Sequence, residues 1–267
     1  MTQGTRAGVM VGAAVAAMAL AAVLPRLAQD PAYHRFADGR RFWGVPNGLD
    51  VWSNLAFPLV GLWGLIRVVA APAGGPGDPF TDSRERWPYA VVCIGVALTG
   101  LGSAWYHAAP DNARLVWDRL PMTLVFMGML AAVVAERVNV AAGLVLLPIL
   151  VASGLASIAY WHASEAVGAG DLRPYALVQF FPALAIPLML WLFPARYNRG
   201  GDIVVVLVIY GAAKIFEALD GRILAMGGVV SGHTLKHLMA ALACGWLIGG
   251  TVARRSSRQV LEQETTG

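Results

Sequence analysis

Two histidines, His233 and His237, stand four positions apart at the start of the last long apolar stretch of the chain. In a helix, side chains at this spacing lie on one face about one turn apart. Two neutral imidazoles presented in this way can bind one metal ion, and zinc is the usual metal at such sites. In a soluble helix the same pair is more often without a metal. At the mouth of a membrane helix it favours a metal site, because polar side chains near hydrocarbon are costly.

Three more polar residues have informative spacing. Ser103 precedes His107 by four positions, so a helix places its hydroxyl on the same face, one turn deeper. That hydroxyl could bond to a metal-bound water or a substrate carbonyl, or back to its own helix, as serines in membrane helices often do. Asp118 stands shortly before Pro121, a pattern that suits a helix N-cap and leaves room for a role in proton transfer.

The composition indicates a polytopic membrane protein. Of the 267 residues, 57% are hydrophobic and 13% are charged, whereas soluble domains carry about 25% charged residues. The net charge of +4 comes from arginines scattered over loops and tail, which suits membrane topology rather than nucleic-acid binding. Both cysteines, Cys93 and Cys244, lie inside apolar stretches, so they imply neither a disulfide framework nor a cysteine-type zinc motif.

The apolar stretches predict an all-α membrane protein, because a helix of about 20 apolar residues can cross the hydrocarbon core and no strand alternation is evident. We expect an N-terminal transmembrane helix within residues 1–28, a seven-helix membrane domain over residues 29–252 and a basic polar C-terminal tail over residues 253–267. The eight spans are expected at 8–24, 50–70, 88–107, 119–136, 139–161, 174–194, 202–219 and 233–252.

Eight spans place both termini on one side of the membrane, and the basic tail with Arg254, Arg255 and Arg258 indicates that this side is cytoplasmic. Polar residues at helix ends gather on the opposite side. Groups far apart in sequence can therefore converge at one membrane depth. The residues in question are Ser53, Asn54, His107, Asp118, His162, His233 and His237.

Together these residues resemble the alkaline ceramidase family. The resemblance lies in Ser103-x3-His107, in Asp118 within an Asp-x-Leu-Pro-Met run and in His233-x3-His237 at the start of the last helix. The family belongs to a wider group of seven-helix membrane hydrolases that includes the adiponectin-type receptors. The resemblance covers about residues 33–252, so residues 8–24 would be an extra N-terminal helix. It also implies that the chain is a bacterial member of the family, located in the cell membrane.

The resemblance implies an intramembrane zinc bound by His107, His233 and His237, with water in the fourth position beside Ser103 and Asp118. It further implies a hydrolase acting on carbon–nitrogen bonds of linear amides. The substrate would be a ceramide or another N-acyl membrane lipid, and the products a fatty acid and a long-chain amine. Asp118 would carry the proton between water and the leaving amine, and Ser103 would steady the oxyanion.

Eukaryotic members of the family resemble one another in an acidic calcium-binding segment before the first core helix. Here that region offers Asp38, Trp43, Asn47 and Asp50, with arginines between them. Calcium takes about 6–8 oxygen ligands, so we expect no matching calcium site.

Two other functions remain open at this point. One is a receptor or lipid-binding membrane protein that keeps zinc for structure, and the other is a transporter with a proton relay. Lys214, Glu217 and Asp220 share one face of the seventh span and predict either a buried ion pair or a contact to a lipid headgroup.

Overall fold

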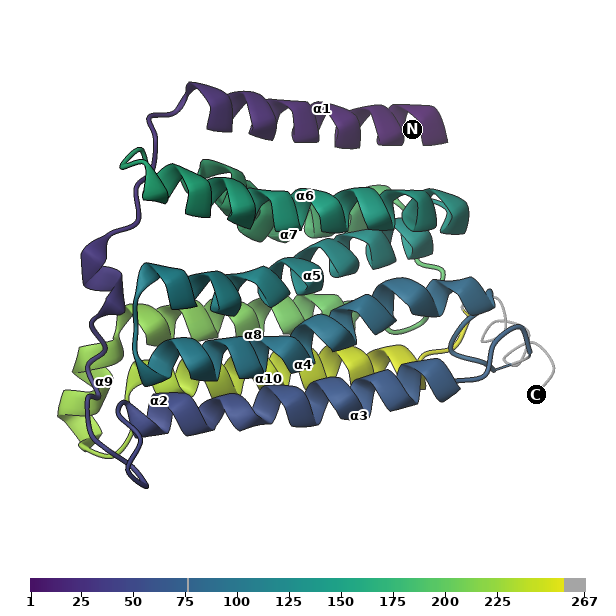
Figure 1. Ribbon diagram of the computed structural model, residues 1–267. Helices are drawn as coiled ribbons and strands as arrows, with labels where there is room; N and C mark the ends of the chain where they lie inside the picture. Colours follow the sequence, from purple (N-terminus) through teal and green to yellow (C-terminus); the bar gives the residue numbers. More distant parts are fainter. Residues whose placement is uncertain (76, 257–267) are drawn as a thin grey trace.

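The computed structural model describes residues 1–75 and 77–256, and this part of the chain is a bundle of helices without strands (Figure 1). The predicted all-α fold is therefore confirmed. Seven of the described helices are long and apolar enough to cross a membrane. The remaining predicted span, at 202–219, corresponds to α8, which lies in the same bundle and carries three charged residues, Asp202, Lys214 and Glu217.

The helices have the following bounds. The long helices and the two short α-helices are α1 (Gln3–Val23), α2 (Gly48–Trp52), α3 (Ala56–Ala70), α4 (Arg86–Ala108), α5 (Asn112–Arg137), α6 (Val140–Ala166), α7 (Arg173–Leu192), α8 (Gly201–Ala218), α9 (Asp220–Gly227) and α10 (Gly232–Ala253). Short 3-10 turns cover Pro31–His34, Ser53–Leu55 and Ser83–Glu85, and the second of these joins α2 to α3 in one nearly continuous span.

The start of α5 differs from the prediction. Asp111 is the N-cap of this helix, and its side chain accepts a hydrogen bond of 2.7 Å from the backbone nitrogen of Arg114. Asp118 lies inside the helix, and so does Pro121. The prediction that Asp118 caps a helix is therefore wrong, because the helix begins at Asn112 and is capped by Asp111, seven residues before Asp118. Its carboxylate is free to face the interior of the bundle.

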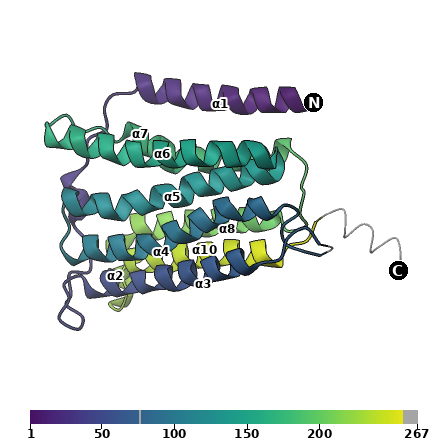
Figure 2. The same cartoon turned by 45° about the vertical axis from the view of Figure 1, so that its right-hand side comes forward.

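Helix α1 lies at the edge of the bundle and packs on α7 (Figures 1 and 2). None of its residues is buried, so it fits an additional span surrounded mostly by lipid. Arg173 ties its end to the core by donating to the carbonyl oxygens of Ala22 and Leu24, at 3.2 and 2.5 Å. Arg173 is itself held by Asp171 at 2.8 Å.

The start of α1 and the end of α10 lie at the same end of the bundle, which agrees with the prediction of eight spans (Figure 1). Arg254, directly after α10, is buried and donates to Glu136 at 2.7 Å and to the Tyr89 hydroxyl at 3.0 Å. Arg258 and the rest of the predicted tail from residue 257 onward lie outside the described residues. The cytoplasmic placement of this end and the bacterial membrane stay predictions.

Candidate metal centre

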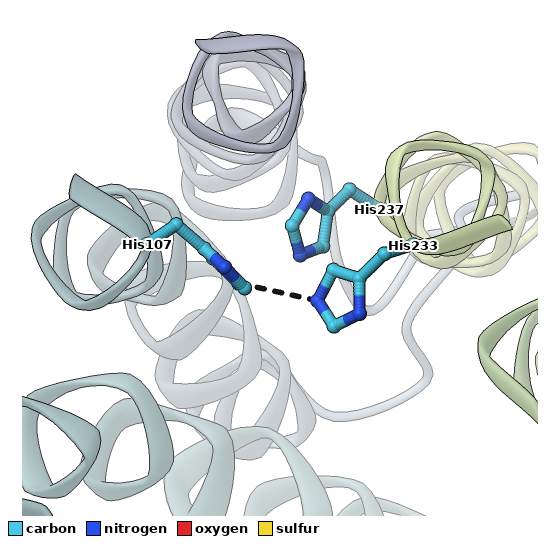
Figure 3. A group of neighbouring side chains, drawn as sticks. All are labelled: His107, His233 and His237. Atoms are coloured by element: carbon cyan, nitrogen blue, oxygen red, sulfur yellow. Dashed lines mark hydrogen bonds between the residues drawn. The ribbon is translucent and has the colours of Figure 1, made fainter. Parts of the chain in front are cut away.

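Three buried histidines meet between the last turn of α4 and the first turns of α10 (Figure 3). His107 comes from α4, and His233 and His237 come from α10. One ring nitrogen from each lies within 4.8 Å of the other two. The structure thus brings together the three residues that the resemblance assigns as zinc ligands.

The histidine nitrogens fit a metal ion. The Nε2 atoms of His107 and His233 are 3.3 Å apart. Two nitrogens bound to one tetrahedral zinc ion at about 2.0–2.1 Å would be about 3.3–3.4 Å apart. The buried Nε2 atom of His237 has no hydrogen-bond partner among the described residues. A buried nitrogen without a partner is unfavourable unless a ligand supplies one, and a metal ion would do so.

Ser53 orients the His237 ring for metal binding. The Ser53 hydroxyl donates to the backbone carbonyl of Asp50 at 3.1 Å and lies 2.8 Å from Nδ1 of His237. Because the Ser53 hydroxyl already donates its proton to the Asp50 carbonyl, Nδ1 of His237 donates to the Ser53 oxygen, and Nε2 of His237 keeps its lone pair. A hydrogen bond of this kind fixes both the tautomer and the ring plane of a metal-binding histidine.

Asp50 and Asp220 hold the start of α10 in place. The buried Asp50 carboxylate accepts from the hydroxyls of Ser231 and Thr234, at 3.0 and 2.6 Å. Asp220 accepts from the backbone nitrogen of His233 at 2.8 Å. These contacts link α2, the start of α9 and the start of α10, which carries both histidines.

Several side chains considered for calcium bond to other protein groups, whereas the buried Oδ2 atom of Asp50 has no hydrogen-bond partner among the described residues. Asp38 forms an ion pair of 2.7 Å with Arg40, which lowers the pKa of that carboxyl. Asn47 donates to the backbone carbonyl of His107 at 2.8 Å, and Trp43 is exposed. Among the described residues, the histidine cluster is the only group of three or more His, Cys, Asp or Glu side chains that could hold a metal ion.

Lys236 is a site residue that the sequence reasoning missed. Its Nζ atom lies 2.8 Å from Nε2 of His233 and 3.0 Å from Glu217. Lys214 also pairs with Glu217, so this glutamate lies between two lysines. The predicted ion pair between Lys214 and Glu217 on α8 is present. Asp220 belongs to the next helix, α9, and its side chain accepts hydrogen bonds from the backbone nitrogens of Ala37 and His233. In the sequence, Lys236 lies between His233 and His237, and this position was the signal that could have identified it.

Ser103 and Asp118 lie beside each other on facing helices and line the same cavity as His237. Both side chains are buried. Their helices approach very closely, because a Cβ atom on Gly102 would come within 1.9 Å of the carbonyl oxygen of Trp117. Glycine at this position therefore lets α4 bring Ser103 and His107 against α5.

The cavity measures about 370 Å³ and extends from the histidines into the bundle. One part has the polar lining just described, and the remainder is lined mostly by apolar side chains, among them Met129, Ile186 and Leu247. A cavity that combines a small polar region with a long apolar one suits a lipid better than a water-soluble metabolite.

Two predicted residues do not join the site. His162 is exposed near the end of α6 and lies outside the histidine cluster, and Asn54 uses its side-chain nitrogen on the backbone of Asp50 at 2.7 Å. Ser53 and Asp118 do join it. Comparison with known proteins adds no assignment, because no family model and no curated protein matches this chain.

Proposed function

We propose that this protein is a zinc-dependent intramembrane hydrolase that cleaves the amide bond of ceramide-like N-acyl lipids. The proposal rests above all on one observation: a buried three-histidine cluster borders a cavity that also contains Ser103, Asp118 and a long apolar section. The order and spacing of these residues resemble the alkaline ceramidase family, which is where the substrate class comes from.

The donor atoms assign the roles. His107, His233 and His237 would hold the metal ion. Bound zinc supplies a Lewis acid that polarises a carbonyl and lowers the pKa of water to about 7. Asp118 accepts a proton from the attacking water and returns it to the amine nitrogen as the carbon–nitrogen bond breaks. The Ser103 hydroxyl donates to the carbonyl oxygen as negative charge develops on it.

The rest of the cavity positions the lipid. Its apolar side chains take the acyl chain, and the amide then lies at the polar region, where a carbonyl can reach both Ser103 and the histidine cluster. Burial also excludes bulk water, which strengthens every electrostatic contact in the site. A receptor that binds the same lipid without cleaving it would need the cavity but not the proton-carrying role of Asp118.

The test is fatty-acid release from a panel of ceramides and other N-acyl lipids by the purified full chain, with zinc content measured in parallel. Wild type should release fatty acid, and His237→Ala should lose both most of its zinc and its activity. His162→Ala is the matched control, because this histidine is exposed and outside the cluster. A folded, zinc-loaded wild type that releases nothing would favour the receptor or lipid-binding alternative.

A further inference from the structure

In the described part of the chain, Arg119 is a buried cation that forms no ion pair with a carboxylate. Its side chain is only 6% exposed, and none of the ion pairs in the described part of the chain includes it. It donates one hydrogen bond, from Nη2 to the Gln29 side chain at 2.7 Å, and its buried Nη1 atom has no partner. A guanidinium offers five N–H donors, so most of its capacity is unused.

Three aromatic rings hold this guanidinium in place. Its central carbon lies 5.3 Å from the ring centre of Tyr33, 4.7 Å from that of Trp161 and 5.0 Å from that of Tyr175. Aromatic faces stabilise a cation but do not neutralise it. Burying an uncompensated charge is costly, so a rigid, unpaired arginine inside a membrane protein indicates a partner that is not part of the chain.

The cavity has one cation in excess. Arg119 lines it together with two lysines, Lys214 and Lys236, and with two carboxylates, Asp118 and Glu217. Glu217 is already shared by both lysines. With ordinary charges this lining carries one more positive than negative group, and a metal ion on the histidines would add to the excess. A ligand with one negative charge restores the balance.

The position of Arg119 indicates which part of a lipid carries that charge. Arg119 follows Asp118 on α5, whereas Met129 lines the apolar part of the cavity ten residues later. Ten helical residues correspond to about 15 Å along the helix axis. The guanidinium contacts groups from the segment between α1 and α2, from the end of α6 and from the start of α7. With the acyl chain in the apolar part and the amide beside Asp118, it lies at the end of the cavity occupied by the amine portion of the lipid.

We propose that Arg119 binds a carboxylate on the amine portion of the N-acyl lipid, so that the preferred substrates are N-acyl amino acids. A planar guanidinium matches a carboxylate better than it matches a hydroxyl, and the charge-assisted bond is the stronger one. The assignment to the amine portion rests on the proposed amidase function. The anion site itself rests only on the burial, the free Nη1 atom and the cavity charges.

The binding test uses ligands that cannot be hydrolysed. They are the ketone analogues of N-lauroyl glycine and N-lauroyl ethanolamine, in which CH2 replaces the amide NH, and their dissociation constants are measured on the zinc-loaded full chain. The two differ in charge but hardly in length. Wild type should bind the carboxylate analogue about ten- to hundredfold more tightly, the range of a charge-assisted hydrogen bond. Arg119→Gln should remove this difference, and Arg119→Lys should keep part of it.

Arg114→Gln is the matched control, because Arg114 lies on the same helix but pairs with Asp111 and Trp105 outside the cavity. Equal binding of both analogues by wild type, or an unchanged preference in Arg119→Gln, would overturn the anion site. If lauric acid shows the same dependence on Arg119, the carboxylate belongs to the acyl end and the assignment to the amine portion is wrong.

Turnover tests the proposed function separately. For the hydrolysable amides, the kcat/KM ratio of N-lauroyl glycine to N-lauroyl ethanolamine should exceed one in wild type and fall towards one in Arg119→Gln. A protein that binds the carboxylate analogue in an Arg119-dependent way but cleaves neither amide would keep the anion site and refute the amidase. Cleavage of both amides without any preference would support the amidase and refute the anion site.

Discussion

Lys236 donates to Nε2 of His233 at 2.8 Å, and the same nitrogen lies 3.3 Å from Nε2 of His107. A lone pair on this nitrogen can serve the lysine or a metal ion but not both. Glu217, 3.0 Å from Nζ of Lys236, offers the lysine another partner when a metal takes the histidine. The lysine therefore competes with the metal for one ligand and adds a positive charge beside it.

Removal of that competitor should strengthen metal binding. We expect Lys236→Met to bind zinc several-fold more tightly than wild type, since the methionine leaves His233 free and removes the repulsion between lysine and metal. Zinc affinity measured by competition with a chelator of known affinity tests this. Lys214→Met is the control, because Lys214 pairs with Glu217 but is not hydrogen-bonded to a histidine. Weaker zinc binding in Lys236→Met would show that the lysine supports the site.

Asp118 is expected to matter for turnover and not for metal binding. It lies in the cavity with Ser103 but outside the three-histidine group. Asp118→Asn keeps the shape and removes the proton carrier, so kcat for amide cleavage should fall by about 10²–10⁴ at unchanged zinc content. Metal analysis and fatty-acid release on the same sample give both readouts. Wild-type turnover in this variant would remove Asp118 from the mechanism.

The sequence predicted most of the fold, because hydrophobic stretches of the right length report the positions of membrane helices. It misplaced Asp118 at a helix end, since four of the eight residues from Asn112 to Arg119 are polar or charged, although Asp111 caps a helix there. The surroundings of Arg119 could not be predicted either. The side chains around its guanidinium come from the segment between α1 and α2, from α6 and from α7. Only the packing of those elements brings them together.

The close approach of α4 and α5 should be sensitive to a single methyl group. A Cβ atom at Gly102 would lie 1.9 Å from the Trp117 carbonyl oxygen, so Gly102→Ala must push the two helices apart. Overpacking of this kind costs about 1–3 kcal/mol. The melting temperature in detergent should fall, and zinc affinity should fall with it because His107 is displaced. Gly211→Ala is the control, since that Cβ atom meets nothing within 4 Å. Equal melting temperatures would contradict the packing.

Calcium should not be needed for activity. Asp38 pairs with Arg40, and the Oδ1 atom of Asp50 accepts from Ser231 and Thr234, so of these two carboxylates only the Oδ2 atom of Asp50 lacks a partner in the described part of the chain. Calcium takes about 6–8 oxygen ligands. Fatty-acid release should therefore survive a chelator selective for calcium and be lost with one that removes zinc. Loss of activity that added calcium restores would show that this loop binds calcium after all.

The docking of α1 should depend on the charge of Asp171. The guanidinium of Arg173 beside this carboxyl holds its pKa well below the usual range, and the same guanidinium donates to carbonyl oxygens at the end of α1. A lowered folded pKa means that ionised Asp171 stabilises the fold above the pKa of the unfolded carboxyl, about 3.9. The stabilisation is lost as the pH falls through that value towards the folded pKa.

We therefore expect Asp171→Asn to raise hydrogen exchange in residues 21–30 at neutral pH, where wild type is protected by the intact contact. The difference between variant and wild type should shrink as the pH falls below about 4, once intrinsic exchange rates are corrected for. Asp82→Asn is the matched control, because Asp82 pairs with Arg84 at 2.7 Å, also has a lowered pKa and lies in another loop. Unchanged exchange in Asp171→Asn at neutral pH would show that other contacts hold α1, such as its packing on α7 and the hydrogen bond from Leu172 to Leu27.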